Sequence, residues 1–204
     1  MTSVPVVHVV DDDEAVRDSL GYLLMAADYE VKSYESATEF LNGFTGQEAG
    51  CLITDVRMPG VTGLELARRL RSLGSKLPII VMTGHADVPM AVEAMKSGAK
   101  DFIEKPFEAD AVLAAVQGAL ARSEQPRSDD AQRSAALMRM ETLSARERDV
   151  LKGLIAGKAN KAMARELGIS PRTVEVYRAA VMTKMQASSL SQLVRMALVA
   201  SQPG

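Results

Sequence analysis

The first 120 residues alternate short apolar runs with stretches whose apolar residues recur at helical spacing, and this alternation restricts the fold more than any other feature. The apolar runs, which we predict to be strands, cover residues 6–10, 30–34, 52–54, 78–82 and 101–104. The helical patterns cover residues 14–26, 36–42, 64–73, 88–96 and 109–121. Strands that alternate with helices predict an α/β domain, with a parallel sheet and helices on both of its faces.

The rest of the 204-residue chain differs in pattern and in charge. Residues 123–132 are polar, and from residue 143 to 200 the pattern is helical, with breaks near residues 157, 168–171 and 187–190. Up to residue 124 there are 11 Lys and Arg against 19 Asp and Glu, a net charge of −8; beyond it there are 13 against 7, a net charge of +6. We therefore predict a first domain at 1–122, a linker with helical potential at 123–139, and a basic all-α domain at 140–204 that suits nucleic acid.

Two absences in the sequence narrow the class of protein. Cys51 is the only cysteine, so no disulfide or cysteine-based metal site can form within the chain, and a buried thiol is favoured over a reactive one. No apolar run reaches the roughly 18 residues of a membrane span, and the acidic N-terminal stretch is unlike a signal peptide. We expect a cytoplasmic protein with no membrane partner.

Polar side chains follow the predicted strands at the points where the strands end. They are Asp11 and Asp12 after the first strand, Asp55 after the third, Thr83 after the fourth and Lys105 after the fifth. The carboxyl ends of parallel strands form one edge of a sheet, so these groups should lie together. A divalent cation, Mg²⁺ or Mn²⁺, would relieve the repulsion between the carboxylates. A lysine and a hydroxyl suit a phosphoryl group, which makes Asp55 a candidate nucleophile for an aspartyl phosphate.

Each of these residues alone has a simpler explanation. One of the acids at 11–13 is expected to cap the first helix, Asp55 could be a turn residue and Lys105 a solvated loop residue. The occurrence of the whole set at the ends of the appropriate strands favours the phosphoryl site. A phosphatase of the aspartyl-phosphate type is an alternative, but it would want a second acid where this chain has Arg57.

The motifs VVDDDE, TDVRMPG, VMTGHA and DFIEKPF resemble those of the receiver domain of bacterial response regulators, over residues 4–122. The resemblance implies a flavodoxin-like (βα)5 fold with strand order 2-1-3-4-5, and Asp55 as the acceptor of a phosphoryl group from a sensor histidine kinase. It implies Mg²⁺ or Mn²⁺ bound by Asp11, Asp12, Asp55 and the backbone carbonyl of Arg57. It also implies that Thr83 and Lys105 contact the phosphoryl group, that Phe102 takes the aromatic switch position, and that the bond from Lys105 to Pro106 is cis. A homodimer through the fourth helix, fifth strand and fifth helix is expected, with no enzymatic activity beyond phosphoryl uptake and slow loss.

The second half of the chain has the signals of a helix-turn-helix. Ser144 and Glu147 have the spacing of a capping box, and Gly168, Ser170 and Pro171 mark a turn between two helices. Such a turn places a recognition helix in the major groove, where cations hold phosphates while Glu and Val can contact base edges. The candidate DNA-binding residues are Asn160, Lys161, Ser170, Arg172, Thr173, Glu175, Val176, Arg178 and Lys184. A small helical bundle that only mediates dimerisation is the alternative.

The motifs LSARERDVL, GKANKAMARELGIS and TVEVYRAAVMTKM resemble those of the LuxR/NarL-type DNA-binding domain, over residues 140–200. Together the two domains resemble FixJ-type transcriptional regulators. That resemblance implies a haem-containing, oxygen-sensing kinase of the FixL type as partner, promoter double-stranded DNA and RNA polymerase as further partners, and control of nitrogen-fixation and microaerobic genes. A paralogous response regulator that serves another kinase and signal remains an alternative, as does an interaction protein that binds no DNA.

Overall fold

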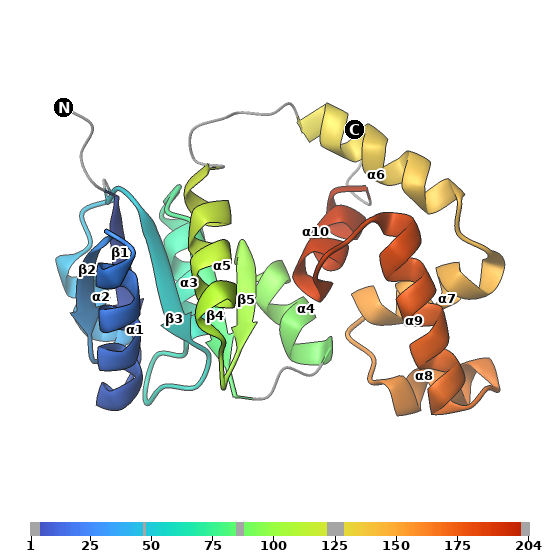
Figure 1. Cartoon of the computed structure of the whole chain (residues 1–204), viewed down its shortest axis with the longest axis horizontal. Coiled ribbons are helices and arrows are strands. Elements are labelled where there is room, and N and C mark those ends of the chain that lie inside the picture. The colour runs from blue at the N-terminus through green and yellow to red at the C-terminus, as the bar shows by residue number, and fades with distance from the viewer. Residues whose placement is uncertain (1–4, 47, 85–87, 122–128, 201–204) are drawn as a thin grey trace. The chain divides into compact units, whose positions relative to one another are not determined.

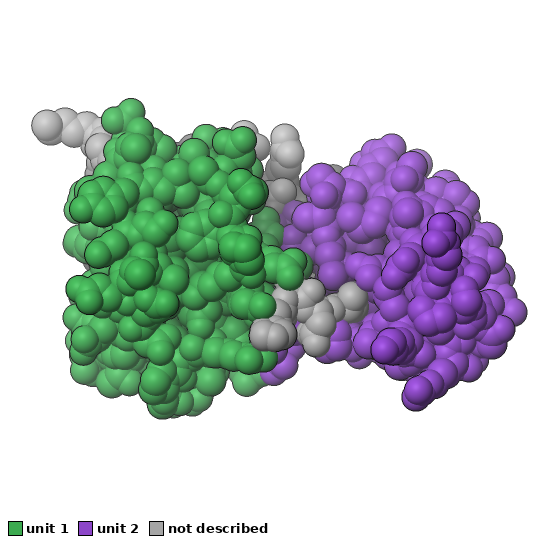
Figure 2. Space-filling view, turned by 60° about the horizontal axis from the view of Figure 1, so that its bottom comes forward, with its two compact units in different colours: residues 1–86, 96–125 green, residues 87–95, 126–204 purple. Residues whose placement is uncertain are grey.

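The computed structural model describes residues 5–46, 48–84, 88–121 and 129–200, and its helices and strands are labelled in Figure 1. By packing, the chain divides into two compact units, residues 1–86 with 96–125 and residues 87–95 with 126–204 (Figure 2). In the described part of the chain, no helix combines the length and the apolar character needed to cross a membrane.

The first unit is built on a parallel sheet of five strands in the order β2-β1-β3-β4-β5. The strands are β1 (Val6–Val10), β2 (Glu30–Tyr34), β3 (Cys51–Asp55), β4 (Ile79–Thr83) and β5 (Asp101–Glu104). This strand order confirms the prediction. The central strands β3 and β4 are buried along their whole length, whereas β2 at one edge alternates between half-buried and exposed residues.

Helices cover both faces of this sheet (Figure 1). They are α1 (Glu14–Ala26), α2 (Ala37–Gly43), α3 (Gly63–Ser72) and α5 (Ala109–Ala121). One core, between the sheet and helices α1 and α5, contains Val7, Val9, Leu20, Leu24 and Val116. On the opposite face His8 of β1 packs against Phe40 of α2, with ring centroids 5.5 Å apart.

The second unit consists of helices around one apolar core. They are α4 (Val88–Lys96, of which Lys96 falls in the first unit), α6 (Asp129–Glu141), α7 (Ala145–Ile155), α8 (Asn160–Leu167), α9 (Pro171–Met185) and α10 (Leu190–Ala200). Its fully buried side chains include Val150, Leu154, Met163, Val181 and Leu193. Ser144 and Glu147 form the predicted capping box at the start of α7, and Gly168 ends α8 in the left-handed conformation.

Two helices extend this core beyond the segment in which the sequence predicts the second domain. Val92 and Met95 of α4 are buried in the core of the second unit, although residues 88–96 are predicted to belong to the first domain. Helix α6 lies in the predicted linker except for its last two residues, and it packs along α10 and buries Ala136. The helical potential predicted for residues 129–139 is therefore realised, while residues 123–128 lie outside the described part.

The helical spacing of apolar residues in the sequence would place Leu73 and Ala162 on core-facing sides of their helices, but both are exposed. Leu73 is 65 % exposed because α3 ends at Ser72, and Leu73 is the C-cap residue that follows the helix. Ala162 lies in the first turn of α8 and is exposed, because the buried side of this helix is formed by Met163 and Ala164.

Candidate functional site

The carboxyl edge of the sheet brings together groups that are far apart in the sequence. Asp55 is the last residue of β3, Thr83 is the last residue of β4, and Asp11 directly follows β1. All three side chains are buried, Asp11 to 1 % exposure and Asp55 to 7 %. Two carboxyl groups and a hydroxyl group thus end three neighbouring central strands.

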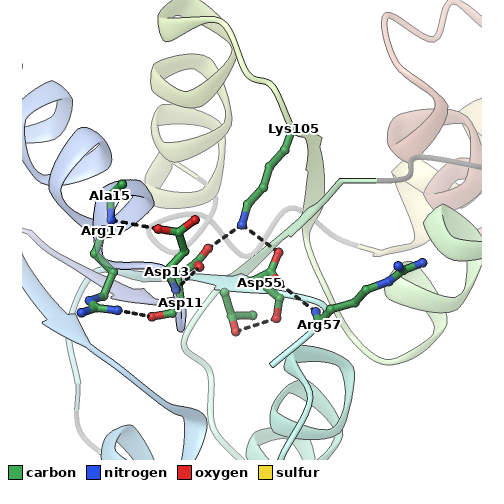
Figure 3. Close-up of polar contacts among 8 residues, drawn as sticks. Asp11, Asp13, Ala15, Arg17, Asp55, Arg57 and Lys105 are labelled. Carbon is green, nitrogen blue, oxygen red and sulfur yellow. Dashed lines mark hydrogen bonds and ion pairs between the residues drawn. The ribbon is translucent and has the colours of Figure 1, made fainter. Parts of the chain in front are cut away.

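Lys105, which follows β5, links the two buried acids (Figure 3). Its Nζ lies 2.6 Å from Oδ2 of Asp11 and 3.0 Å from Oδ1 of Asp55. Burial by itself lowers the pKa of Lys105, but hydrogen bonds to the two carboxylates and their charges raise it above its ordinary value. Burial raises the pKa of Asp11, although the hydrogen bond from Lys105 acts in the opposite direction. The lysine therefore keeps its charge while it lowers the cost of burying Asp11 as an anion.

The turn between β1 and α1 gives its three acids different surroundings, and Figure 3 shows two of them, Asp11 and Asp13. The Asp13 carboxylate accepts a hydrogen bond from the backbone N–H of Ala15 at 2.9 Å and caps α1. The Asp11 Oδ1 accepts a hydrogen bond from the backbone N–H of Asp13 at 3.0 Å. Asp12 is exposed. Asp13 is thus the acid that caps the helix, as one of the three was expected to do.

Asp55 is held from the side opposite Lys105. The backbone N–H of Arg57 donates to Oδ2 of Asp55 at 2.9 Å (Figure 3). Behind the strand end lies Gly63, the first residue of α3, where a Cβ atom would fall 2.0 Å from the Asp55 carbonyl oxygen. Because no side chain fits at that point, the start of α3 can pack directly on the backbone of Asp55.

The donor set fits a hard divalent cation. Asp11 and Asp55 lie close enough to share one ammonium group, so they lie close enough to share one metal ion. Among the described residues no three acidic, His or Cys side chains are clustered as a ready metal site, and Asp12 does not join the other two acids. Mg²⁺ is commonly held by one or two carboxylates together with waters and phosphate oxygens, so two buried acids with Asp12 nearby suffice.

The two predicted switch residues lie on neighbouring strands of the sheet. In the β4–β5 register Thr83 pairs with Glu104 and Val81 with Phe102, so Phe102 lies two residues before the position opposite Thr83. Phe102 is half-buried and Thr83 is buried. The cis bond between Lys105 and Pro106 is present, as the resemblance implied.

The predicted DNA-binding residues gather on α8 and α9 of the second unit. Ser170 caps α9, because its hydroxyl accepts from the backbone N–H of Thr173 at 3.1 Å. Arg172, Glu175 and Val176 are exposed on α9, and Val176 is 63 % exposed although it is apolar. Lys161 is exposed in the first turn of α8. The exposed face of α9 therefore presents cationic, acidic and apolar groups, which suits contact with both phosphates and base edges.

Two cations of this set also make contacts within the unit. Arg178 donates from Nη1 to Oδ1 of Asn160 at 3.1 Å, which joins α9 to the start of α8. Lys184 donates to Oε2 of Glu147 at 2.7 Å, and Glu147 is the buried acid of the capping box. Asn160, Arg178 and Lys184 thus help to hold the recognition helix, and their contact with DNA stays a prediction.

Three residues that support these sites were not predicted from the sequence. Arg17 of α1 donates to the backbone carbonyl of Asp11, Gly63 lies against the carbonyl of Asp55, and Glu147 pairs with Lys184. A signal existed for two of them: Arg17 comes soon after the acid run, and Glu147 has a capping role that implies burial near α9. The close approach at Gly63 depends on how α3 packs, which the sequence does not reveal.

Comparisons with known proteins identify both parts of the chain. Residues 7–117 match the family model described as "Response regulator receiver domain". Residues 141–197 match the model described as "Bacterial regulatory proteins, luxR family".

Similarity to individual proteins extends over nearly the whole chain. The chain is 57 % identical to the transcriptional regulatory protein FixJ of Azorhizobium caulinodans, covering 97 % of this chain and 93 % of that protein. It is 44 % identical to the response regulator protein TodT of Pseudomonas putida, covering 93 % of this chain and 84 % of that protein. Among solved structures, full-length FixJ from B. japonicum is 50 % identical, with a TM-score of 0.58 and all of both chains covered.

Proposed function

Because the chain belongs to the bacterial response regulators that join a receiver domain to a LuxR-type DNA-binding domain, we propose that it is a transcriptional regulator switched by phosphorylation of Asp55. The observation that supports this most directly is the carboxyl edge of the sheet, where Lys105 bridges the buried carboxylates of Asp11 and Asp55. We further propose that it works in the cytoplasm, where a sensor histidine kinase supplies the phosphoryl group.

The phosphoryl transfer uses groups that the fold already holds in place. A carboxylate oxygen of Asp55 attacks the phosphorus of a phosphohistidine, a P–O bond forms and the P–N bond breaks. The electron pair of that bond stays on the imidazole nitrogen of the kinase. Arg57 contributes its backbone N–H to the second oxygen of Asp55, which keeps the carboxylate oriented during the attack.

The remaining residues of the edge stabilise the charge of the phosphoryl group. Asp11, Asp12, Asp55 and the Arg57 carbonyl would hold Mg²⁺ or Mn²⁺, which when bound supplies positive charge to the phosphoryl oxygens. Lys105 can pass from the two carboxylates to a phosphoryl oxygen because its ammonium already lies 3.0 Å from Asp55. The chain is thus a stoichiometric acceptor, and we expect no turnover beyond phosphoryl uptake and slow hydrolysis.

Thr83 would transmit the phosphorylation of Asp55 to the rest of the protein. Its hydroxyl can turn toward the phosphoryl oxygens, and Phe102 on the neighbouring strand can follow it inward. Thr83 ends β4, and the chain then leads within five residues to α4, whose Val92 and Met95 are buried in the core of the second unit. We propose that phosphorylation favours a homodimer through α4, β5 and α5.

The output is binding of promoter DNA by α8 and α9. Exposed Lys161 and Arg172 would contact phosphates, and Glu175 and Val176 would face base edges. Dimerisation would place two such recognition helices on one operator and so raise the affinity by avidity. RNA polymerase would be the next partner at the promoter.

The proposal is tested by measuring the affinity of the full chain for a pool of genomic DNA fragments. The measurement is made with Mg²⁺, with and without beryllofluoride as a mimic of the phosphoryl group. We expect tighter binding and an enriched sequence motif with beryllofluoride. DNA binding that ignores beryllofluoride would overturn the switch, and no binding in either state would favour an interaction protein that binds no DNA.

The genes and the signal form a finer part of the proposal. The similarity to FixJ proteins supports control of nitrogen-fixation or oxygen-responsive genes through a haem-containing kinase of the FixL type. The similarity to TodT supports the alternative, a paralogous regulator with another kinase and signal. The enriched DNA motif decides between them, because its genomic positions identify the controlled genes.

A further inference from the structure

The side chain of Arg17 spans the turn that carries the three acids, and no step of the proposed phosphoryl transfer uses it. Its Nη1 donates to the backbone carbonyl of Asp11 at 2.8 Å (Figure 3). Arg17 lies in α1, and its own backbone N–H donates to the carbonyl of Asp13 at 3.1 Å. One residue of the helix thus binds both ends of the 11–13 turn.

This contact completes the hydrogen bonding of Asp11. The backbone N–H of Asp11 donates to the carbonyl of Tyr34 at 3.3 Å, Oδ1 accepts from Asp13 and Oδ2 from Lys105. The backbone carbonyl is the remaining polar group of a residue that is 1 % exposed, and Arg17 satisfies it. A buried carbonyl without a partner is costly, so without Arg17 the turn would have to shift toward water.

We infer that Arg17 is a positioning residue of the phosphorylation site, which holds the 11–13 turn so that Asp11 and Asp12 face a divalent cation. The inference rests on the proposed function, since it assumes that these acids bind Mg²⁺. Arg17 acts through Asp11, because the hydrogen bond from its side chain ends on a backbone oxygen and not on a carboxylate.

The direction in which Mg²⁺ affinity changes when Arg17 is removed distinguishes a positioning role from a purely electrostatic one. A guanidinium close to a cation site repels the cation, so if Arg17 acted through its charge alone, its removal would strengthen Mg²⁺ binding. If Arg17 holds the turn, its removal weakens Mg²⁺ binding in spite of the lost repulsion. A role confined to folding stability would lower the melting temperature and leave the Mg²⁺ affinity of the folded protein unchanged.

The test is a Mg²⁺ titration of the full chain, followed by the chemical shifts of backbone amides around residues 11–13 and 55–57. We expect Arg17→Ala to raise the Mg²⁺ dissociation constant by about tenfold, near the lower end of the range for the loss of one hydrogen bond from a charged donor. Arg17→Lys, which keeps the charge and one donor, should lie between Arg17→Ala and the wild type. Arg69→Ala is the matched control, because it removes the same charge from α3, where Arg69 pairs with Glu65, and should leave Mg²⁺ binding unchanged.

An unchanged or lower Mg²⁺ dissociation constant in Arg17→Ala would overturn the inference. It would leave the proposed function unaffected. If Arg17→Ala does not fold, Arg17→Lys decides in its place: weakened binding supports positioning, and wild-type binding contradicts it. A wild-type chain that binds neither Mg²⁺ nor beryllofluoride would overturn the proposed function, and the inference with it.

Discussion

The proposed phosphorylation site and the proposed DNA-binding face are built in opposite ways. The phosphorylation site joins residues 94 positions apart, Asp11 and Lys105, through buried contacts at the ends of strands. The DNA-binding face lies on α8 and α9, which are adjacent in the sequence, and most of its side chains are exposed. The first site should therefore lose phosphoryl uptake at once when Asp55 is changed, whereas the second should lose affinity in small steps.

The largest effect is expected from replacing Asp55, the proposed nucleophile. We expect Asp55→Asn to abolish covalent phosphoryl uptake from acetyl phosphate, because a neutral amide lacks the nucleophilic oxygen. Intact-mass spectrometry measures the uptake, and circular dichroism checks that the fold is retained. Thr83→Ala is a useful control, since it removes a phosphate contact but leaves the nucleophile, and should still take up the group. A phosphorylated Asp55→Asn protein would show that the acceptor lies elsewhere.

A smaller effect is expected when the bridging cation is removed. Lys105→Met leaves Asp11 and Asp55 facing each other, and it should lower the free energy of unfolding by about 2 kcal/mol near pH 7, as for a lost hydrogen bond between charged groups. Urea unfolding of the variant and the wild type measures this difference.

The pH dependence of the same variant has a definite sign. Without Lys105 the pKa of Asp11 rises further above its ordinary value of 3.8, so at acidic pH Asp11 becomes neutral and the difference from the wild type shrinks. The pKa of Lys105 in the folded wild type lies above its ordinary value of 10.5. On the alkaline side its contribution is therefore complete up to that pH, and it is lost as the pH rises through the folded value. A difference that grew toward acidic pH would contradict the bridge.

On the DNA-binding face a single cation should matter only moderately. Arg178→Ala should weaken binding about tenfold on every DNA sequence, which corresponds to about 1.4 kcal/mol, and should reduce the salt slope by about 1. Asn160→Ala should weaken binding less and leave the slope nearly unchanged if Asn160 mainly holds Arg178. Affinities at several salt concentrations measure both quantities. A changed sequence preference in Arg178→Ala would mean that Arg178 contacts bases.

The smallest effect is expected at the Lys184–Glu147 pair, because Lys184 is 40 % exposed and such pairs contribute little. The hydrogen bond from Lys184 lowers the pKa of Glu147 below its ordinary value of 4.5. The pair therefore stabilises the fold above pH 4.5 and is lost as the pH falls through the folded pKa. Glu147→Gln should melt slightly below the wild type at neutral pH and converge with it in acid. The melting temperatures of both proteins are measured across this pH range. If the pair has no effect, the difference between the two melting temperatures will be the same at every pH.

The comparison also explains which parts of the structure could be predicted from the sequence. Asp55, Thr83 and Lys105 could be placed at one edge because parallel strands fix where their carboxyl ends lie, whatever the side-chain conformations. The bridge from Lys105 to Asp11 and the bond from Arg17 could not, because they depend on rotamers and on how α1 packs. Periodicity failed at Leu73, which follows α3, and at Ala162, in the first turn of α8, because a repeating pattern is least informative at the ends of a helix.

The helical unit shows a second limit of the sequence pattern. The four helices α7 to α10 and the capping box at Ser144 were predicted, because caps and breaks are local signals. The packing of α4 and α6 was not predicted, because apolar side chains such as Val92, in this core, and Ala136, buried on α6, do not indicate which neighbour they will pack against. Apolar spacing indicates that a face is buried, and only the fold determines its partner.

Gly63 has a consequence for how mutational data on this protein should be interpreted. Any Cβ at that position would fall 2.0 Å from the Asp55 carbonyl oxygen, so every replacement must push the start of α3 away from the nucleophile. In a saturation library scored for signalling, position 63 should therefore tolerate substitution as poorly as position 55. Gly63, which has no side-chain functional group, would then be as sensitive to substitution as Asp55, because the contact between α3 and Asp55 leaves no room for a Cβ atom.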